Sequence, residues 1–414
     1  MDVACYDGTS LHARRRSTSR PHVVALAFSV ATLVAIGCGT SRHPPALGDD
    51  PAPPVDASTG FDFDSPPPEL SCNLGPEGGV CACADEALDA NAPNLYFVLD
   101  RSGSMSELWG GTSDKWQVVI NAIARLVVGL GPRAKIGAAV FPDPGSANAC
   151  GPGVEALAPR EGDSPAGRAG PTAIALLTVL GQISANGGTP TAATLQAPWL
   201  TQELSSLSAK SKTYVILATD GGPNCNASAT CGTDRDGVQA CQPNIESVAN
   251  CPPGGPNNCC TGPSGALSCE DSAPTIAAVT ALAAAGTPVY VIGVPGSTPY
   301  ANLLDQLAIA GGTDRGQEPH YYAADTADQS QFVTAISRIA AKLAGGCTVQ
   351  LDNPPPDPTH VNVFLGGQVL PQTGADGWTL DGSTVTILGA SCQSILDGDV
   401  IDVRVVGGCP TVLI

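Results

Sequence analysis

The chain has few basic residues for its length of 414. It contains 19 Lys and Arg against 38 Asp and Glu, which gives a formal net charge of −19. Nucleic-acid phosphates and anionic lipid surfaces repel such a chain, and no basic patch interrupts its acidity. The composition therefore excludes nucleic-acid binding and suits a solvated surface outside the cytoplasm.

Residues that commonly carry catalysis are also scarce. Of five histidines, only His43, His320 and His360 follow the N-terminal leader, and His43 lies in a linker. The metalloprotease motif HExxH and the hydrolase motif GxSxG are both absent, and no Cys/His pair can be placed together. No general base is evident, so we do not expect an enzyme.

The sequence has no CxxC pair although it contains 16 cysteines. Structural zinc sites commonly use such pairs or fixed Cys/His spacings. A reducing cytosol rarely supports so many cysteines without a metal or a redox role. The cysteines therefore predict disulfide bonds and an oxidising compartment.

The N-terminus (1–38) provides a route to that compartment. Arg14, Arg15, Arg16 and Arg20 precede an apolar run over 23–36 that is short for a membrane-spanning helix. Ala35-Ile36-Gly37-Cys38 then resembles the bacterial lipobox, in which the chain is cut before a cysteine that receives lipid. We expect an exported protein anchored through Cys38, with the outer membrane favoured because Gly39 is not Asp; ordinary secretion is the alternative.

Residues 39–91 predict a linker followed by a cysteine-rich lead-in. Proline pairs and scattered aspartates stiffen and solvate its first part, which cannot bury enough apolar surface to fold. Cys72, Cys81 and Cys83 mark the lead-in.

Residues 92–345 alternate between buried-strand and amphipathic-helix patterns. This alternation predicts an α/β domain, a doubly wound and mostly parallel sheet with helices on both faces. The expected strands are 94–100, 136–141, 213–219, 288–294 and 320–324, with a short edge strand at 155–158. The expected helices are 116–130, 171–183, 191–207 (kinked or ended by Pro198), 273–285, 301–310 and 331–343.

Two further segments depart from this rhythm. Residues 223–272 carry seven cysteines without periodicity and predict a disulfide-stapled insertion, for which Cys150 is a candidate eighth partner. Residues 346–414 contain short strands separated by Gly, Pro and Asp turns, and they predict a small β module held in part by Cys347, Cys392 and Cys409.

Oxygen-bearing side chains gather where the expected strands end. Asp100-Arg-Ser102-Gly-Ser104 ends the first strand, Asn186-Gly-Gly-Thr189 precedes a helix, and Asp220 ends the strand at 213–219. Ligands of open α/β sheets bind beyond the carboxyl ends of the strands. Because all five donors are oxygens, Asp100, Ser102, Ser104, Thr189 and Asp220 predict a site for a hard divalent cation. Isolated Asp and Ser residues could instead cap turns or helices.

These three motifs, in this order, resemble the metal-ion-dependent adhesion site of the von Willebrand factor type A domain. The resemblance covers 92–345, and the whole arrangement is similar to multi-part lipoproteins of myxobacteria-like organisms. It implies that Ser102, Ser104 and Thr189 coordinate the ion directly, and that Asp100 and Asp220 act directly or through water. Mg²⁺ is the expected ion, with Ca²⁺ and Mn²⁺ as alternatives, and a carboxylate of a protein or envelope partner would fill an open position.

The sequence thus predicts a metal-dependent adhesion protein of the cell envelope. The alternative is a structural envelope protein whose metal site is vestigial or only stabilises the fold. The metal-dependent hydrolase that we also considered lacks a base.

Overall fold

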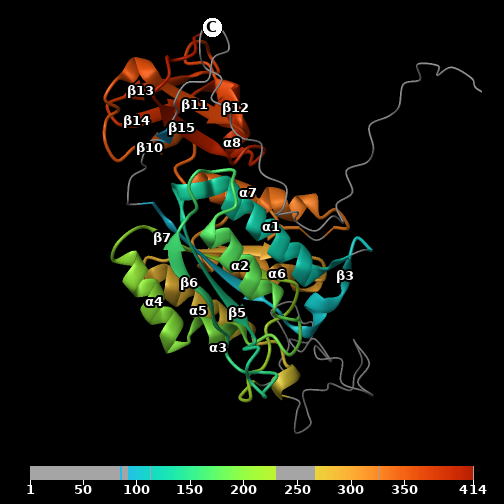
Figure 1. The fold of residues 1–414 in the computed structure, drawn as a ribbon. Helices are drawn as coiled ribbons and strands as arrows, with labels where there is room; N and C mark the ends of the chain where they lie inside the picture. The colour runs from blue at the N-terminus through green and yellow to red at the C-terminus, as the bar shows by residue number, and fades with distance from the viewer. Residues whose placement is uncertain (1–83, 86–91, 112, 230–265, 325, 414) are drawn as a thin grey trace, which may run out of the picture. The chain divides into compact units, whose positions relative to one another are not determined.

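The computed structural model describes residues 84–85, 92–111, 113–229, 266–324 and 326–413 (Figure 1). The leader with Cys38, the linker, the cysteines of the lead-in and the centre of the 223–272 insertion lie outside these ranges, so those predictions stay predictions. The division of the chain into an α/β domain over 92–345 and a β module over 346–414 also stays a prediction.

A six-stranded sheet forms the centre of the α/β part, in the order β6-β5-β2-β7-β8-β9. All neighbouring strands are parallel except β5 and β6, which are antiparallel. The strands are β2 (Asn94–Asp100), β5 (Lys135–Phe141), β6 (Val154–Glu161), β7 (Thr213–Thr219), β8 (Val289–Gly293) and β9 (Tyr322–Ala323). In chain order this arrangement is 3-2-1-4-5-6, the doubly wound order, and its direction reverses between β2 and β7.

Strand β2 shows why the central strands are uniformly apolar. Leu95, Phe97 and Leu99 pack into one hydrophobic cluster, whereas Tyr96 and Val98 pack into another on the opposite face. A strand covered on both faces has no solvent side on which to place polar residues. The continuous apolar run over 94–100 therefore predicted this strand with its correct bounds.

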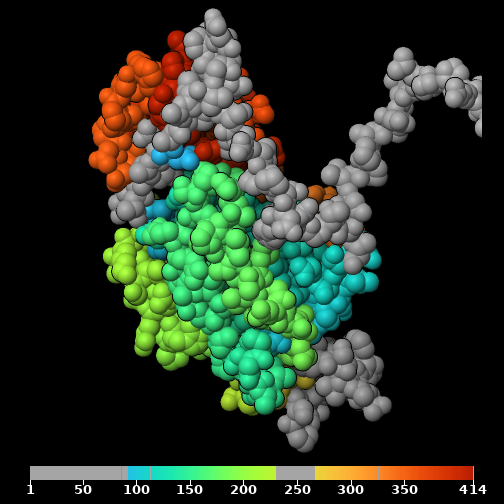
Figure 2. All heavy atoms as spheres, in the orientation of Figure 1, coloured from blue at the N-terminus to red at the C-terminus, as the bar shows by residue number. Residues whose placement is uncertain are grey.

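Helices cover both faces of the sheet (Figure 1). One cluster contains residues of α1 (Lys115–Leu130), α2 (Pro171–Gly181) and α7 (Ser330–Leu343). The other contains residues of α3 (Thr191–Leu195), α4 (Pro198–Ser208), α5 (Ser272–Ala284) and α6 (Ala301–Ala310). Figure 2 shows α2 and β6, in green, forming much of the surface in that orientation. The predicted doubly wound α/β fold is confirmed.

Helix α1 begins and ends where its sequence predicts. The Asp114 side chain accepts a hydrogen bond from the Gln117 N–H at 2.7 Å and so caps the helix. Gly131, with φ of 55°, ends the helix in a conformation that favours glycine. The apolar face predicted from residue spacing is buried between these ends.

Several elements differ from their predicted extent, and β9, for example, spans only Tyr322–Ala323 where 320–324 was expected. The helix predicted over 191–207 is interrupted at Pro198, as expected, and forms α3 and α4, because Pro198 lacks an N–H and occupies the first turn of α4. Strand β6 is longer than the predicted 155–158, since antiparallel pairing with β5 continues to Glu161.

The C-terminal part contains two small antiparallel sheets, ordered β1-β15-β11-β12 and β10-β14-β13. Their inward side chains share a hydrophobic cluster that includes Trp378. The elements are β1 (Ala84–Asp85), β10 (Thr348–Gln350), β11 (Val361–Leu365), β12 (Gln368–Leu370), β13 (Trp378–Asp381), β14 (Thr384–Ile387), α8 (Gly389–Leu396) and β15 (Val403–Gly407). Helix α8 was not predicted, and neither was the pairing of the lead-in strand β1 with β15.

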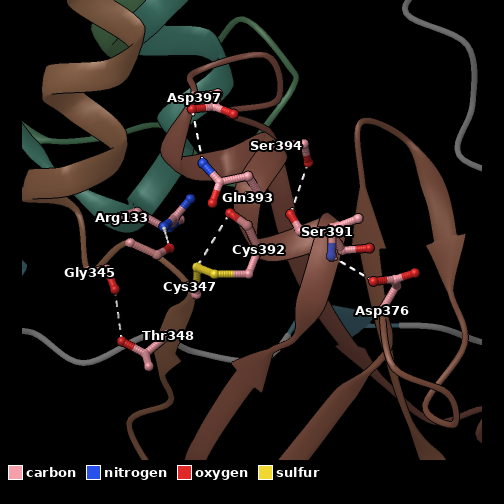
Figure 3. Close-up of a disulfide and its surroundings, with 12 residues drawn as sticks. Arg133, Gly345, Cys347, Thr348, Asp376, Ser391, Cys392, Gln393, Ser394 and Asp397 are labelled. Atoms are coloured by element: carbon pink, nitrogen blue, oxygen red, sulfur yellow. Dashed lines mark hydrogen bonds between the residues drawn. A yellow bond between two sulfur atoms is a disulfide. The ribbon is translucent and has the colours of Figure 1, made fainter.

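A disulfide joins Cys347, just before β10, to Cys392 on α8 (Figure 3). Nearby, the buried Arg133 donates from Nη2 to the carbonyl oxygens of Ala344 and Gly346 at 3.0 and 3.1 Å. These contacts fix the segment that leads from α7 into β10. Cys409 is buried in the same part of the chain.

Candidate functional site

The candidate site lies where the strand order reverses. Asp100 is the last residue of β2, and Asp220 follows the last residue of the adjacent strand β7. Both aspartates are buried, with exposed fractions of 1% and 2%. Carboxyl ends of parallel strands on either side of a reversal leave a crevice in which ligands of such sheets bind.

Four of the five predicted ligands form one chain of hydrogen bonds. The backbone N–H of Ser102 donates to Asp100 Oδ1 at 2.8 Å, and the Ser102 and Ser104 hydroxyl oxygens lie 3.2 Å apart. The Ser104 hydroxyl then donates to Asp220 Oδ1 at 2.8 Å. Side chains 116 residues apart in the sequence therefore face one another across the strand ends.

Thr189 reaches the site through its loop. The Gly103 N–H donates to the Gly187 carbonyl at 2.8 Å, and the Asn186 N–H donates to the Arg101 carbonyl at 2.7 Å. Thr189 itself is 4% exposed. Among the described residues, no hydrogen bond joins its hydroxyl to the other four predicted ligands. The structure thus places the fifth ligand's loop against the serine turn.

Glycine is required in this loop at position 187. Gly187 has φ of 93°, and a Cβ there would lie 2.8 Å from the Ala149 carbonyl oxygen and from Pro142 Cγ. The loop consequently approaches the neighbouring backbone closely because it carries no side chain at this position.

The buried lysine Lys115, at the start of α1, was missed in the sequence. It is 3% exposed, and its Nζ lies 2.8 Å from Asp220 Oδ2 and 2.8 Å from Glu107 Oε2. Burial lowers the pKa of Lys115, but Asp220 and Glu107 raise it further, so the net shift is upward and the ammonium stays charged. Asp220 Oδ1 therefore accepts from Ser104, and Asp220 Oδ2 is paired with the Lys115 ammonium.

The pKa values of both aspartates are raised, in each case first by burial. Burial, followed by the charge of Asp220, raises the pKa of Asp100 to about 7, while hydrogen bonds from Thr219 and Ser102 oppose the rise. Burial also raises the pKa of Asp220, and Lys115 opposes that rise. In the part of the chain that the structure describes, Lys115 is the one ammonium in contact with this group, and it pairs with Asp220 and Glu107 but not with Asp100, so the place favours additional positive charge.

The donor set fits a hard divalent cation. It offers two carboxylates and three neutral hydroxyls, all of them oxygen donors. Within the described ranges, no group of three or more His, Cys, Asp and Glu residues could hold a metal. A cation here would therefore depend on Ser102, Ser104 and Thr189 as well as on the aspartates, which makes the hydroxyl geometry decisive.

A cavity of about 690 Å³ lies elsewhere, against β9 and α7. Its lining includes three cationic side chains, Arg315, Arg338 and Lys342, against one carboxylate, Asp314, and none of the predicted ligands. Three cationic side chains would repel a divalent cation. The cavity therefore gives no alternative location for the metal.

No protein-family model matches the chain, and no curated protein is similar to it in sequence. Several solved structures are similar in fold. The pilus adhesin SpaC from Lactobacillus rhamnosus GG aligns at 16% identity over 78% of this chain and 40% of its own, with a TM-score of 0.42. The PilB minor pilin from Streptococcus sanguinis aligns at 15% identity over 63% of this chain and 62% of its own, with a TM-score of 0.37.

A protein described as von Willebrand factor type A from Catenulispora acidiphila aligns at 12% identity over 80% of this chain and 62% of its own, with a TM-score of 0.37. The chain therefore spans less than two thirds of the length of each of these proteins. Their similarity is limited to the general arrangement of helices and strands.

Proposed function

We propose that this protein binds a divalent cation at the strand ends and uses it to capture a carboxylate on a partner. The supporting observation is the run of hydrogen bonds from Asp100, through the Ser102 backbone N–H and the Ser102 and Ser104 hydroxyls, to Asp220. These residues come from two strands of the sheet and meet at its point of reversal. A turn or helix cap would not require them to meet there.

Each residue has a distinct part in the proposed site. Ser102, Ser104 and Thr189 would bind the ion through their hydroxyls, and Asp100 and Asp220 would bind it directly or through water. The cation supplies positive charge and an open coordination position for the partner's carboxylate. Thr219 and the Ser102 N–H hold the Asp100 carboxylate in place, while Ser104 lies on the exposed side, from which a partner can approach.

We further propose that the protein acts outside the cytoplasm and is anchored through Cys38. The disulfides Cys150–Cys225 and Cys347–Cys392 support an oxidising compartment. None of the described helices is both long and apolar enough to cross a membrane. The anchor itself rests on the sequence around Cys38.

A structural role is the second candidate, and Lys115 favours it. Its ammonium already balances Asp220 without any bound ion. In that case the oxygen cluster would stabilise the sheet ends, and neither cation nor chelator would affect partner binding.

Titration of the full chain with Mn²⁺ tests the proposal. We expect saturable binding that Ser104→Ala weakens at least about tenfold, as is usual when a metal's immediate surroundings are disturbed. Ser106→Ala is the matched control, because its exposed hydroxyl donates to the Gly103 carbonyl and is not a predicted ligand.

Capture from a cell-envelope extract tests the second half of the proposal. We expect wild-type protein to retain a partner with Mg²⁺ and to release it with EDTA, and Ser104→Ala to retain none. Identical retention by wild type and Ser104→Ala, with or without EDTA, would support the structural role instead.

A further inference from the structure

A disulfide links the two segments that flank the Thr189 loop. Cys150 lies in the loop after β5, and Cys225 lies just beyond β7, 75 residues later in the sequence. Cys150 was the predicted partner for a cysteine of the insertion, and the Cys150–Cys225 bond confirms that pairing.

The residue before each of these cysteines holds the Thr189 loop. The Ala149 carbonyl accepts the Gly188 N–H at 2.9 Å. The Asn224 side-chain oxygen accepts the Thr189 N–H at 2.7 Å, and the Asn224 N–H donates to the Thr189 carbonyl at 2.9 Å. The N–H and carbonyl of Thr189 are thus hydrogen-bonded to the segment that carries Cys225. The N–H of Gly188, the preceding residue, is hydrogen-bonded to the segment that carries Cys150.

The segment around Cys225 is itself held in an unusual conformation. Cys225 has φ of 74°, a left-handed value that non-glycine residues seldom adopt. Its N–H donates to the Leu267 carbonyl at 2.9 Å, and Asn224 is 1% exposed. A conformation of this kind persists only where the surroundings impose it, and the disulfide is one such constraint.

We propose that the Cys150–Cys225 disulfide is a positioning device for Thr189. It fixes both flanks of the loop and so holds Thr189 beside the turn that carries Ser102 and Ser104. Reduction of the bond to two thiols by an external dithiol, which is itself oxidised to a disulfide, frees the two flanks, loosens the loop and lowers cation affinity, so capture of a partner becomes sensitive to thiol reductants. This inference rests on the proposed function for its effect on metal binding, but its effect on the loop can be measured without metal.

A second disulfide provides a matched control. Cys347–Cys392 has the same Cα–Cα distance of 5.2 Å and closes a segment of 45 residues in the C-terminal part (Figure 3). Neither cysteine contacts a predicted ligand. Loss of this bond therefore reports the general effect of removing a disulfide.

The experiment compares the full chain with its Cys150→Ser/Cys225→Ser and Cys347→Ser/Cys392→Ser variants. Amide hydrogen exchange at Thr189, measured in EDTA, reports the loop, and Mn²⁺ titration reports the site. We expect the first variant to exchange faster at Thr189 and to bind Mn²⁺ at least about tenfold more weakly. The control variant should match wild type in both measurements.

Asn224→Ala keeps the disulfide and provides a second test if the Cys150→Ser/Cys225→Ser variant does not fold. It removes the side-chain acceptor of the Thr189 N–H, so exchange should again rise and affinity fall. Unchanged exchange at Thr189 in a folded Cys150→Ser/Cys225→Ser variant would overturn the inference, whatever Asn224→Ala does, and so would unchanged Thr189 exchange in Asn224→Ala. Normal Thr189 protection in wild type without any Mn²⁺ binding would instead refute the proposed function and leave the positioning role standing.

Discussion

Replacing Lys115 with methionine tests whether this lysine competes with the metal for Asp220 or assists metal binding. The substitution keeps most of the side chain's length and removes the charge that holds Asp220 Oδ2 at 2.8 Å. Both atoms are buried, whereas the partner Glu107 is 68% exposed and adds little. Removing one member of a buried ion pair costs about 3–5 kcal/mol because the remaining charge is left uncompensated.

In the presence of EDTA, we therefore expect Lys115→Met to lower the free energy of unfolding by about 3 kcal/mol. With Mg²⁺ present, we expect part of this lost stability to be recovered. The wild-type ammonium repels a cation bound beside Asp220, so its loss should strengthen Mg²⁺ binding about tenfold or more, equivalent to ~1.4 kcal/mol. Mg²⁺ would then restore more stability to the variant than to wild type, by linkage of binding to folding.

Urea unfolding followed by circular dichroism, with Mg²⁺ and with EDTA, measures these changes, and calorimetric titration measures affinity. Lys135→Met is the control, because the Glu161 partner of Lys135 is largely exposed. The reasoning is refuted if Lys115→Met unfolds like wild type in EDTA. It is also refuted if the variant binds Mg²⁺ more weakly, since Lys115 would then be assisting the metal site.

Two further predictions concern other parts of the fold. The Asp314 carboxylate lies 2.6 Å from His320 Nδ1 and raises the pKa of His320 above 6.5, while the hydrogen bond with His320 lowers the pKa of Asp314. The pairing is therefore present below pH 6.5 as long as Asp314 stays ionised, and it is lost as pH rises through the raised pKa of His320. Asp314→Asn should lower the His320 pKa in an NMR titration, and an unchanged pKa would contradict this. The buried Asp163 carboxylate accepts three N–H groups at the start of α2, so Asp163→Ala should reduce the unfolding free energy by about 2 kcal/mol in urea. Asp114→Ala, which removes one exposed helix cap, should lower the unfolding free energy by half as much or less. Equal losses in Asp163→Ala and Asp114→Ala would argue against the role of burial.

The elements predicted most accurately are those whose patterns are dictated by local burial. Strands β2 and β7 and helix α6 have the predicted bounds, because a strand or helix embedded in the core must be apolar along its buried surface. The positions of Asp100 and Asp220 followed from these strands and from the rule for carboxyl ends. The meeting of four predicted ligands was thus accessible from sequence, although their binding of metal is still a prediction.

Features that depend on distant partners were not accessible. Lys115 stands at the polar start of a helix, where a lysine ordinarily reaches solvent, and its burial arises only when Asp220 is brought beside it. The pairing of Ala84–Asp85 with β15 joins segments more than 300 residues apart, aided by the ion pair of Asp85 with Arg404. Helix α8 was missed because its run of small and polar residues has little apolar periodicity, and only Ile395 in it is buried.

The two outer strands of the six-stranded sheet make poor templates for intermolecular association. Strand β9 has only two residues, and β6 contains Pro159 and shifts register against β5. Short or irregular margins discourage neighbouring copies from adding their own strands and aggregating. Pairing of central sheets between neighbouring copies is therefore disfavoured at both edges.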